Sequence, residues 1–229
     1  MPTFLAPITP KSPQNPSSHN LPSQTYLTLK NVAVARGEYV LCDKVSFVVK
    51  AGDICHIIGE NGLGKTTLLM QIAGLLPTIK GDIDYQGLSS ATGAVYLGHQ
   101  AGLNDKLTVA QNLQFLLALY QITLSAQALA QALAQVGLFG FDDVVAGELS
   151  AGQTRRVGLA RLWLTPKSVA PLWLLDEPLT ALDKAMSEQL LARFGEFASD
   201  GGAIILTSHQ PIAIANQCVD LAGFGGGDE

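Results

Sequence analysis

Apolar and polar positions in the first part of the chain follow two different spacings. Residues 26–35 and 39–49 carry β-branched and aromatic side chains at close to every second position, which predicts an antiparallel pair of strands. Residues 54–58 form a short apolar run that ends in a glycine-rich turn, and over residues 68–76 apolar side chains recur at helical spacing. This pattern indicates a strand, a turn and an amphipathic helix in that order.

The rest of the chain continues the alternation. Short strands are expected at 81–85, 94–97, 172–175 and 203–207, and helices at 108–136, after Ser150 and at 184–198. The helical pattern breaks near 122–125, where Ser125 is suited to cap a second helix. Strands that alternate with helices indicate an α/β fold with a mostly parallel sheet covered on both sides.

Three regions depart from this pattern. Residues from about 100 to 165 contain no strand pattern, so we expect an inserted helical subdomain there. Residues 1–25 are expected to be a disordered polar tail, because residues 1–24 hold six of the eleven prolines and Lys11 as their one Lys, Arg, Asp or Glu residue. Four glycines in residues 223–229 predict a flexible end, which leaves 26–222 as the folded domain.

Composition excludes several classes of protein. With 48% hydrophobic and 14% charged residues among 229, the chain cannot be disordered throughout. A net charge of −5 argues against a nucleic-acid partner, because neutralising phosphates requires a basic surface. No apolar run approaches the ~18–20 residues that span a bilayer, which argues against a membrane span. The first residues lack a basic signal region, which argues against secretion. The three cysteines form no CxxC pair and are interpreted as reduced thiols. We therefore expect an intracellular protein with no membrane span of its own.

The strongest chemical signal is segment 59–66, which fits the phosphate-loop pattern G-x-x-x-x-G-K-[ST]. A glycine-rich backbone can curl around phosphate oxygens and point N–H groups inward, and the helix after it adds partial positive charge. Lys65 is expected to reach the β- and γ-phosphates, Thr66 to ligate Mg²⁺ and Thr67 to lie near the α-phosphate. The predicted nucleotide-binding residues here are Gly59, Glu60, Asn61, Gly62, Leu63, Gly64, Lys65, Thr66 and Thr67. The alternative, a glycine turn without function, does not explain the strand before it and the helix after it.

A second signal lies where the apolar strand at 172–175 ends in Asp176 and Glu177. Ligands of open α/β sheets bind at the carboxyl ends of the strands. Asp176 is suited to the Mg²⁺ site, and Glu177 can accept a proton from an attacking water. Taken alone, such a pair is more often a solvated strand end, but the phosphate loop upstream favours the functional interpretation.

The third signal is Leu149-Ser150-Ala151-Gly152-Gln153, just before a predicted helix. Ser150 is suited to cap that helix. A capped helix start with a glycine beside it also presents N–H groups that can bind phosphate, so the two roles are compatible.

Together these motifs resemble ATP-binding-cassette ATPases. The phosphate loop, Gln100, the segment 149–153, Asp176-Glu177, Ala181-Leu182-Asp183 and His209 occur in the order and approximate spacing of that family, over about residues 26–218. The resemblance implies a P-loop ATPase core with an antiparallel β subdomain and a helical subdomain. It also implies ATP and Mg²⁺ as cofactors.

The resemblance further implies a role for each motif. Two copies pair head to tail in this family, so Ser150 and Gly152 are expected to contact the γ-phosphate of the nucleotide on a second copy. Gln153 and Asp183 are implied nucleotide-binding residues as well. Gln100 is expected at the metal and near the membrane subunits. The implied catalytic residues are Glu177, His209 and Lys65, with His209 at the γ-phosphate, and the implied metal site is Thr66, Gln100 and Asp176.

A narrower resemblance is to the ATPase subunits of bacterial cytochrome c biogenesis (haem export) transporters. It implies that ATP hydrolysis is coupled either to haem export or to the release of a haem chaperone. It is carried by the segments 96–100, 107–108, 112–113, 150–157, 159–164 and 207–210, and by Ala151 where most cassettes have glycine. The implied protein is peripheral, on the cytoplasmic face of the inner membrane, with integral membrane subunits and a second copy of itself as partners.

One departure from the family concerns the nucleotide base. The aromatic residue that usually stacks on adenine is replaced by Arg36, although Tyr39 is close enough to substitute. A guanidinium plane can stack on a base, so both residues remain candidates.

Other functions remain open at this stage. The chain could be the ATPase of a transporter for another substrate, or a soluble cassette protein without a transport role. Soluble cassettes usually carry two cassettes or a long insertion, and a small P-loop kinase would lack the motif at Ser150 and the histidine at 209.

Overall fold

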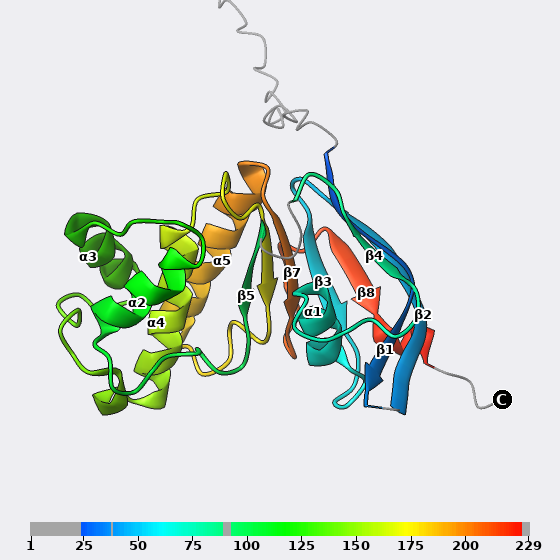
Figure 1. The fold of residues 1–229 in the computed structure, drawn as a ribbon, viewed down its shortest axis with the longest axis horizontal. Coiled ribbons are helices and arrows are strands. Elements are labelled where there is room, and N and C mark those ends of the chain that lie inside the picture. Colours follow the sequence, from blue (N-terminus) through cyan, green and yellow to red (C-terminus); the bar gives the residue numbers. More distant parts are fainter. Residues whose placement is uncertain (1–23, 38, 89–92, 226–229) are drawn as a thin grey trace, which may run out of the picture.

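The computed structural model describes residues 24–37, 39–88 and 93–225. The predicted N-terminal tail, except for its last two residues, lies outside these ranges. The described chain forms two sheets and a group of helices, with a parallel sheet between the antiparallel sheet and the helices (Figure 1).

The parallel sheet has five strands in the order β5-β6-β7-β3-β8. Their bounds are β5 Ala94–Leu97, β6 Leu172–Leu175, β7 Ala203–Thr207, β3 Ile54–Ile58 and β8 Gln217–Asp220. Strands β6 and β7 are buried at every position, as expected where helices or a second sheet cover both faces. Alternate residues therefore enter two cores, with Trp173 and Leu175 on one face and Leu172 and Leu174 on the other.

The antiparallel sheet covers one of these faces. It has the order β2-β1-β4, with β1 Thr25–Arg36, β2 Tyr39–Lys50 and β4 Asp82–Tyr85. Helix α1, Lys65–Ile72, lies between the two sheets, and its Leu68, Leu69 and Ile72 are fully buried there (Figure 1). This packing fixes the start of α1 against the end of β3.

Helices cover the other face and extend away from it. Their bounds are α2 Val109–Ala118, α3 Ala126–Gln135, the 3₁₀ turn η2 Ala146–Glu148, α4 Ala151–Leu164 and α5 Lys184–Ser199. The side chains of Thr108, Ser125, Ser150 and Asp183 each cap a helix N-terminus. Trp173 joins sheet to helix, because its ring stacks on Phe197 of α5 with 3.7 Å between centroids.

The predicted α/β class, antiparallel subdomain and helical subdomain are confirmed by this arrangement. Strand β8 was not predicted. Folded structure also continues beyond residue 222, because the 3₁₀ turn η3 spans Leu221–Phe224 and Gly225 forms a β-bridge with Cys42. The predicted domain boundary at 222 is therefore too early by at least three residues. Among the described residues, no helix is both long and apolar enough to cross a membrane.

Candidate functional site

The phosphate loop joins β3 to α1 and depends on glycine at defined positions. Gly62 and Gly64 have φ of 89° and 95°, in the left-handed region that other residues rarely adopt. A Cβ on Gly64 would also stand 2.7 Å from Cγ1 of Val34. The backbone conformation and the packing against Val34 therefore both require glycine where the loop enters the helix.

Lys65, the first residue of α1, returns over this loop. Its Nζ donates to the carbonyl oxygen of Gly59 at 2.6 Å and to that of Glu60 at 3.1 Å. The ammonium group is thus held at the mouth of the loop, where the motif places the β- and γ-phosphates.

Asp176 connects the loop to the ends of two strands. The residue is only 3% exposed. Its carboxylate accepts hydrogen bonds from Oγ1 of Thr66 at 2.9 Å and from Oγ1 of Thr207 at 2.8 Å. A carboxylate beside a threonine hydroxyl offers the oxygen ligands that Mg²⁺ prefers. Thr66 and Asp176 therefore fit the predicted metal site.

Glu177 follows at once and adopts an uncommon backbone conformation, with φ of 51°. Its N–H donates to Oγ1 of Thr207 at 2.9 Å, and its Oε2 accepts from Oγ1 of Thr180 at 3.4 Å. Oε1 lies 3.5 Å from Nε2 of His209. The backbone of Glu177 is thus fixed by Thr207, and its carboxylate has one buried oxygen, Oε1, that forms no hydrogen bond with the described residues and lies beside a histidine.

These groups share one pocket of about 430 Å³. It is lined by most of the predicted residues, namely Arg36, Asn61, Gly62, Gly64, Lys65, Thr66, Thr67, Asp176, Glu177 and His209, together with Leu41 and His99. Basic and hydroxyl groups line its loop side, and carboxylates line its strand side. This arrangement can bind a nucleoside triphosphate with a divalent cation and activate a water beside it.

Arg36, rather than Tyr39, borders this pocket. Tyr39 is 80% exposed and lies outside it, although it pairs with Arg36 across β1 and β2. In this conformation Arg36 and Leu41 are the candidates for contact with the base.

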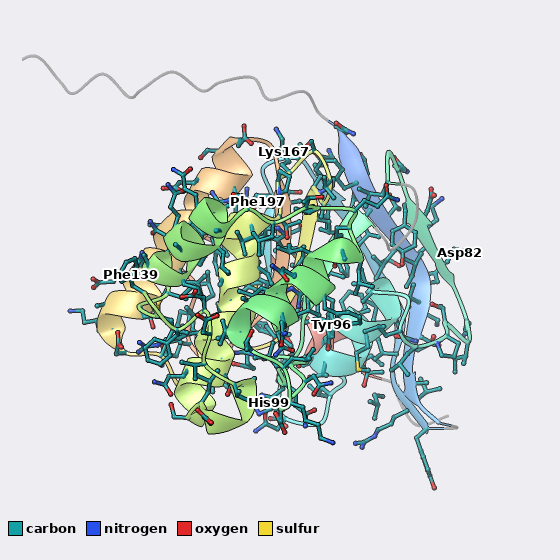
Figure 2. The ribbon with its side chains drawn as sticks, turned by 60° about the vertical axis from the view of Figure 1, so that its left-hand side comes forward. Asp82, Tyr96, His99, Phe139, Lys167 and Phe197 are labelled. Atoms are coloured by element: carbon teal, nitrogen blue, oxygen red, sulfur yellow. The ribbon has the colours of Figure 1, made fainter. Side chains whose placement is uncertain are left out.

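Gln100, predicted at the metal, is not among the residues that line the nucleotide pocket. It lines a neighbouring hollow with Ala151 and Thr154, whereas His99 borders both that hollow and the nucleotide pocket. Figure 2 shows His99 at the edge of the molecule opposite Lys167. Sequence reasoning missed His99, because the family motif directs attention to the next residue.

Four further predicted residues are absent from the lining of the nucleotide pocket, namely Ser150, Gly152, Gln153 and Asp183. Ser150 and Gln153 form a reciprocal capping box at the start of α4, and a Cβ on Gly152 would meet open space. Asp183 caps α5 and forms an ion pair with Arg156 at 2.7 Å. Within one chain, these four residues do not reach the phosphate loop's pocket.

Arg155 is a further site residue that sequence reasoning missed. It is 9% exposed and bonds to backbone carbonyls on both sides of the nucleotide pocket, at Gly98 and His99 and at Asp176 and Glu177. Burial lowers the pKa of its guanidinium, and the carboxylates of Asp176 and Glu177 oppose that change. No periodic signal in the sequence singles it out, because its hydrogen-bond partners are backbone carbonyls of distant residues.

Tyr96, near the end of β5, contributes no second titrating group near neutral pH. Burial, together with the charge of Asp176, raises the pKa of Tyr96 to about 12. The phenol therefore stays neutral near neutral pH.

Comparison with known proteins agrees with this geometry. Residues 42–180 match the model of the ABC transporter family. The cytochrome c biogenesis ATP-binding export protein CcmA of Vibrio cholerae is 46% identical over 197 residues, covering 83% of this chain and 94% of the relative. The protein of the same name from Haemophilus influenzae is 41% identical over 209 residues, covering 88% and 97%.

Solved structures give the same fold. A putative ABC transporter ATP-binding protein from Pyrococcus furiosus superimposes with a TM-score of 0.75 at 26% identity, covering 87% of this chain and 99% of that one. A structure described as the ATP-binding subunit of an ABC transporter superimposes with a TM-score of 0.76 at 25% identity, covering 86% of each chain.

Proposed function

Because this chain belongs to the ABC transporter family of ATP-binding proteins, we propose that it is the ATP-hydrolysing subunit of a transporter complex for cytochrome c biogenesis. One observation carries the ATPase chemistry. The phosphate loop and the carboxylates at the end of β6 face one pocket, joined by the 2.9 Å hydrogen bond from Thr66 to Asp176. The biological process is supported by the identity to the CcmA proteins over most of both chains.

Each residue of the pocket has a proposed part in the reaction. The loop N–H groups and Lys65 hold the β- and γ-phosphates, and Thr66 with Asp176 would hold Mg²⁺. The cation, when bound, neutralises charge on the phosphates. Glu177 accepts the proton of the attacking water, and His209, 3.5 Å away, orients that water and the γ-phosphate end. Base binding is assigned to the side of the pocket formed by Arg36 and Leu41.

A second copy of the chain completes the site in this proposal. The helix start formed by Ser150, Gly152 and Gln153 is exposed or half-buried and lies outside its own chain's pocket. Its orphan N–H groups can bind the γ-phosphate held by the loop of a partner copy. Asp183, which fixes the start of α5, is proposed to lie at the same interface.

The proposed membrane partner contacts the exposed side of α2. Phe115 and Leu119 are 62% and 68% exposed, one helical turn apart, and Leu119 borders a hollow of about 390 Å³ with Leu75 and Tyr120. Large apolar side chains at a hollow are typical of a protein interface. We propose that integral membrane subunits bind here and hold the protein at the cytoplasmic face of the inner membrane.

Acidic substitutions on this surface are expected to release the protein. Phe115→Glu with Leu119→Glu should lower the fraction that sediments with membranes by about tenfold or more, because each change buries a charge at the interface. ATP affinity of the purified variant should stay within about threefold of wild type, since neither residue borders the nucleotide pocket. Unchanged sedimentation with membranes would show that subunits bind elsewhere.

Deletion of the gene tests the biological process. Cells without it are expected to lack mature c-type cytochromes on haem-stained gels, with recovery from the wild-type chain and none from Lys65→Ala. Normal cytochromes c after deletion, with no second copy of the gene, would contradict the assignment and favour a transporter for another substrate. A native protein found only in the soluble fraction of cells would instead favour a soluble cassette.

A further inference from the structure

Arg155 has an unusual set of contacts for a side chain in the middle of a helix. One terminal nitrogen, Nη1, donates to the carbonyl oxygens of Gly98 at 2.6 Å and His99 at 3.2 Å. The other, Nη2, donates to those of Asp176 at 2.9 Å and Glu177 at 2.7 Å. A single guanidinium thus holds the ends of β5 and β6, two strands that are neighbours in the parallel sheet.

These contacts reach two places where the backbone must be fixed. Glu177 has a φ of 51°, a conformation that an L residue keeps only when its surroundings impose it. The Arg155 bond holds the carbonyl of Glu177, while Thr207 holds its N–H at 2.9 Å. Without the guanidinium, the peptide after Glu177 loses this partner and can rotate, which would move the carboxylate away from His209.

On the β5 side, the guanidinium holds the backbone of the loop that carries His99 and Gln100. The carbonyls of Gly98 and His99 both accept hydrogen bonds from Arg155, and His99 borders both the nucleotide pocket and the neighbouring hollow that Gln100 lines. Loss of the guanidinium would leave this loop without both bonds.

We infer that Arg155 is a positioning residue for ATP hydrolysis, which holds Glu177 and the loop after β5 in their working arrangement and connects both to helix α4. The inference rests on the proposed role of Glu177 as the group that activates water. The four hydrogen bonds of Arg155 all go to backbone carbonyls, and among the described residues it forms none with the phosphate loop or with the carboxylate groups of Asp176 and Glu177.

The position of Arg155 on α4 gives this contact a mechanical consequence. Ser150, which caps α4, lies five residues earlier, or about 7.5 Å along the axis at 1.5 Å per residue. A movement of the helix start when it meets a partner's nucleotide must therefore move the Glu177 carbonyl or break its bond to Arg155. The nucleotide site of one copy is thereby connected to the water-activating group of its partner.

Steady-state kinetics of two variants test this inference. Arg155→Gln removes the charge and shortens the side chain so that it cannot bridge both pairs of carbonyls, and Arg155→Lys keeps the charge but has a single donor group. We expect kcat to fall by about 10-fold to 100-fold in Arg155→Gln, the size of effect that follows from misplacing a reacting group by about 1 Å. Arg155→Lys should be intermediate, and KM for ATP should change by less than about threefold in both.

Arg161 provides the matched control. It is also a buried arginine of α4, 7% exposed, but its neighbour is Tyr120 and not the nucleotide pocket. Arg161→Gln is expected to lower the melting temperature while kcat per folded molecule stays unchanged. If the Arg155 variants lose stability like Arg161→Gln but keep the wild-type kcat per folded molecule, Arg155 is merely structural and the inference is wrong. If Arg155→Gln does not fold, the Arg155→Lys variant decides in the same way.

A double-mutant cycle separates this inference from the proposed function. If Arg155 acts through Glu177, adding Arg155→Gln to Glu177→Gln should lower the remaining turnover by less than about threefold, because the two losses are not independent. If Arg155→Gln lowers turnover by the same factor in the Glu177→Gln chain as in the wild type, Arg155 does not act through Glu177. Near-normal turnover in Glu177→Gln alone would refute the proposed role of Glu177 whatever the Arg155 variants do.

Discussion

Replacing Glu177 with glutamine is expected to lower ATP turnover by about 10²–10⁴ while ATP binding persists, the range found when a positioned general base is removed. The change keeps the size of the side chain and its contact with Thr180, but the amide can no longer accept a proton from water. The phosphate loop, Lys65 and Thr66 are untouched, so affinity for the nucleotide should remain. Phosphate release and nucleotide binding, measured on one preparation, give both quantities.

Glu188→Gln is the control for this substitution. Glu188 lies on the exposed surface of α5, one turn after Lys184, with which it forms an ion pair at 3.8 Å, and its side chain is 66% exposed. Neutralising it should therefore leave turnover unchanged. Turnover of Glu177→Gln within about threefold of wild type would remove Glu177 from the role of general base.

Mixing two inactive variants is expected to restore activity. Lys65→Ala removes the ammonium group from the loop, and Ser150→Arg removes the cap of α4 and fills the space at its start with a bulky charged side chain. In a mixed dimer, one of the two sites combines an intact loop with an intact helix start. Each variant alone should show less than about a hundredth of wild-type turnover, and the mixture should recover a clear fraction of it.

The control for mixing places both mutations on the same chain. A chain carrying both Lys65→Ala and Ser150→Arg, mixed with wild type, leaves one loop and one helix start intact on the same copy, so neither site of that mixed dimer is complete. Absence of recovery from the two single variants, with mixed dimers demonstrated by mass spectrometry, would contradict head-to-tail pairing.

Local patterns were sufficient to predict most of this fold. The strand, glycine turn and helix around residues 54–72 could be read directly, because the apolar spacing and the phosphate-loop motif indicate the same elements. Strand β8 was missed, since it has four residues, of which Val219 alone is buried, and its pairing with β3 is a long-range contact. The 3₁₀ turn after it was missed because Gly223 and the glycines that follow the turn resemble a flexible end.

The site shows a similar division. Thr66 could be predicted because it belongs to the phosphate-loop motif, and Asp176 because it ends an apolar strand. The structure joins the two residues by a hydrogen bond. The place of His99 at the pocket could not be predicted, because the family motif singles out Gln100 and the path of the loop after β5 depends on long-range contacts such as the bond from Arg155 to the His99 carbonyl. Long side chains that bond to backbone leave no periodic signal in a sequence.

Association of the Glu177→Gln chain on binding ATP is the most direct test of the central claim, which is that ATP is cleaved between the loop of one copy and the helix start of another. Sedimentation velocity should show a dimer with Mg²⁺ and ATP and a monomer with ADP, because the variant binds ATP without consuming it. Adding Ser150→Arg to this variant should abolish the dimer while ATP still binds. A monomer at saturating ATP, or a dimer that forms equally well with Ser150→Arg, would contradict the claim.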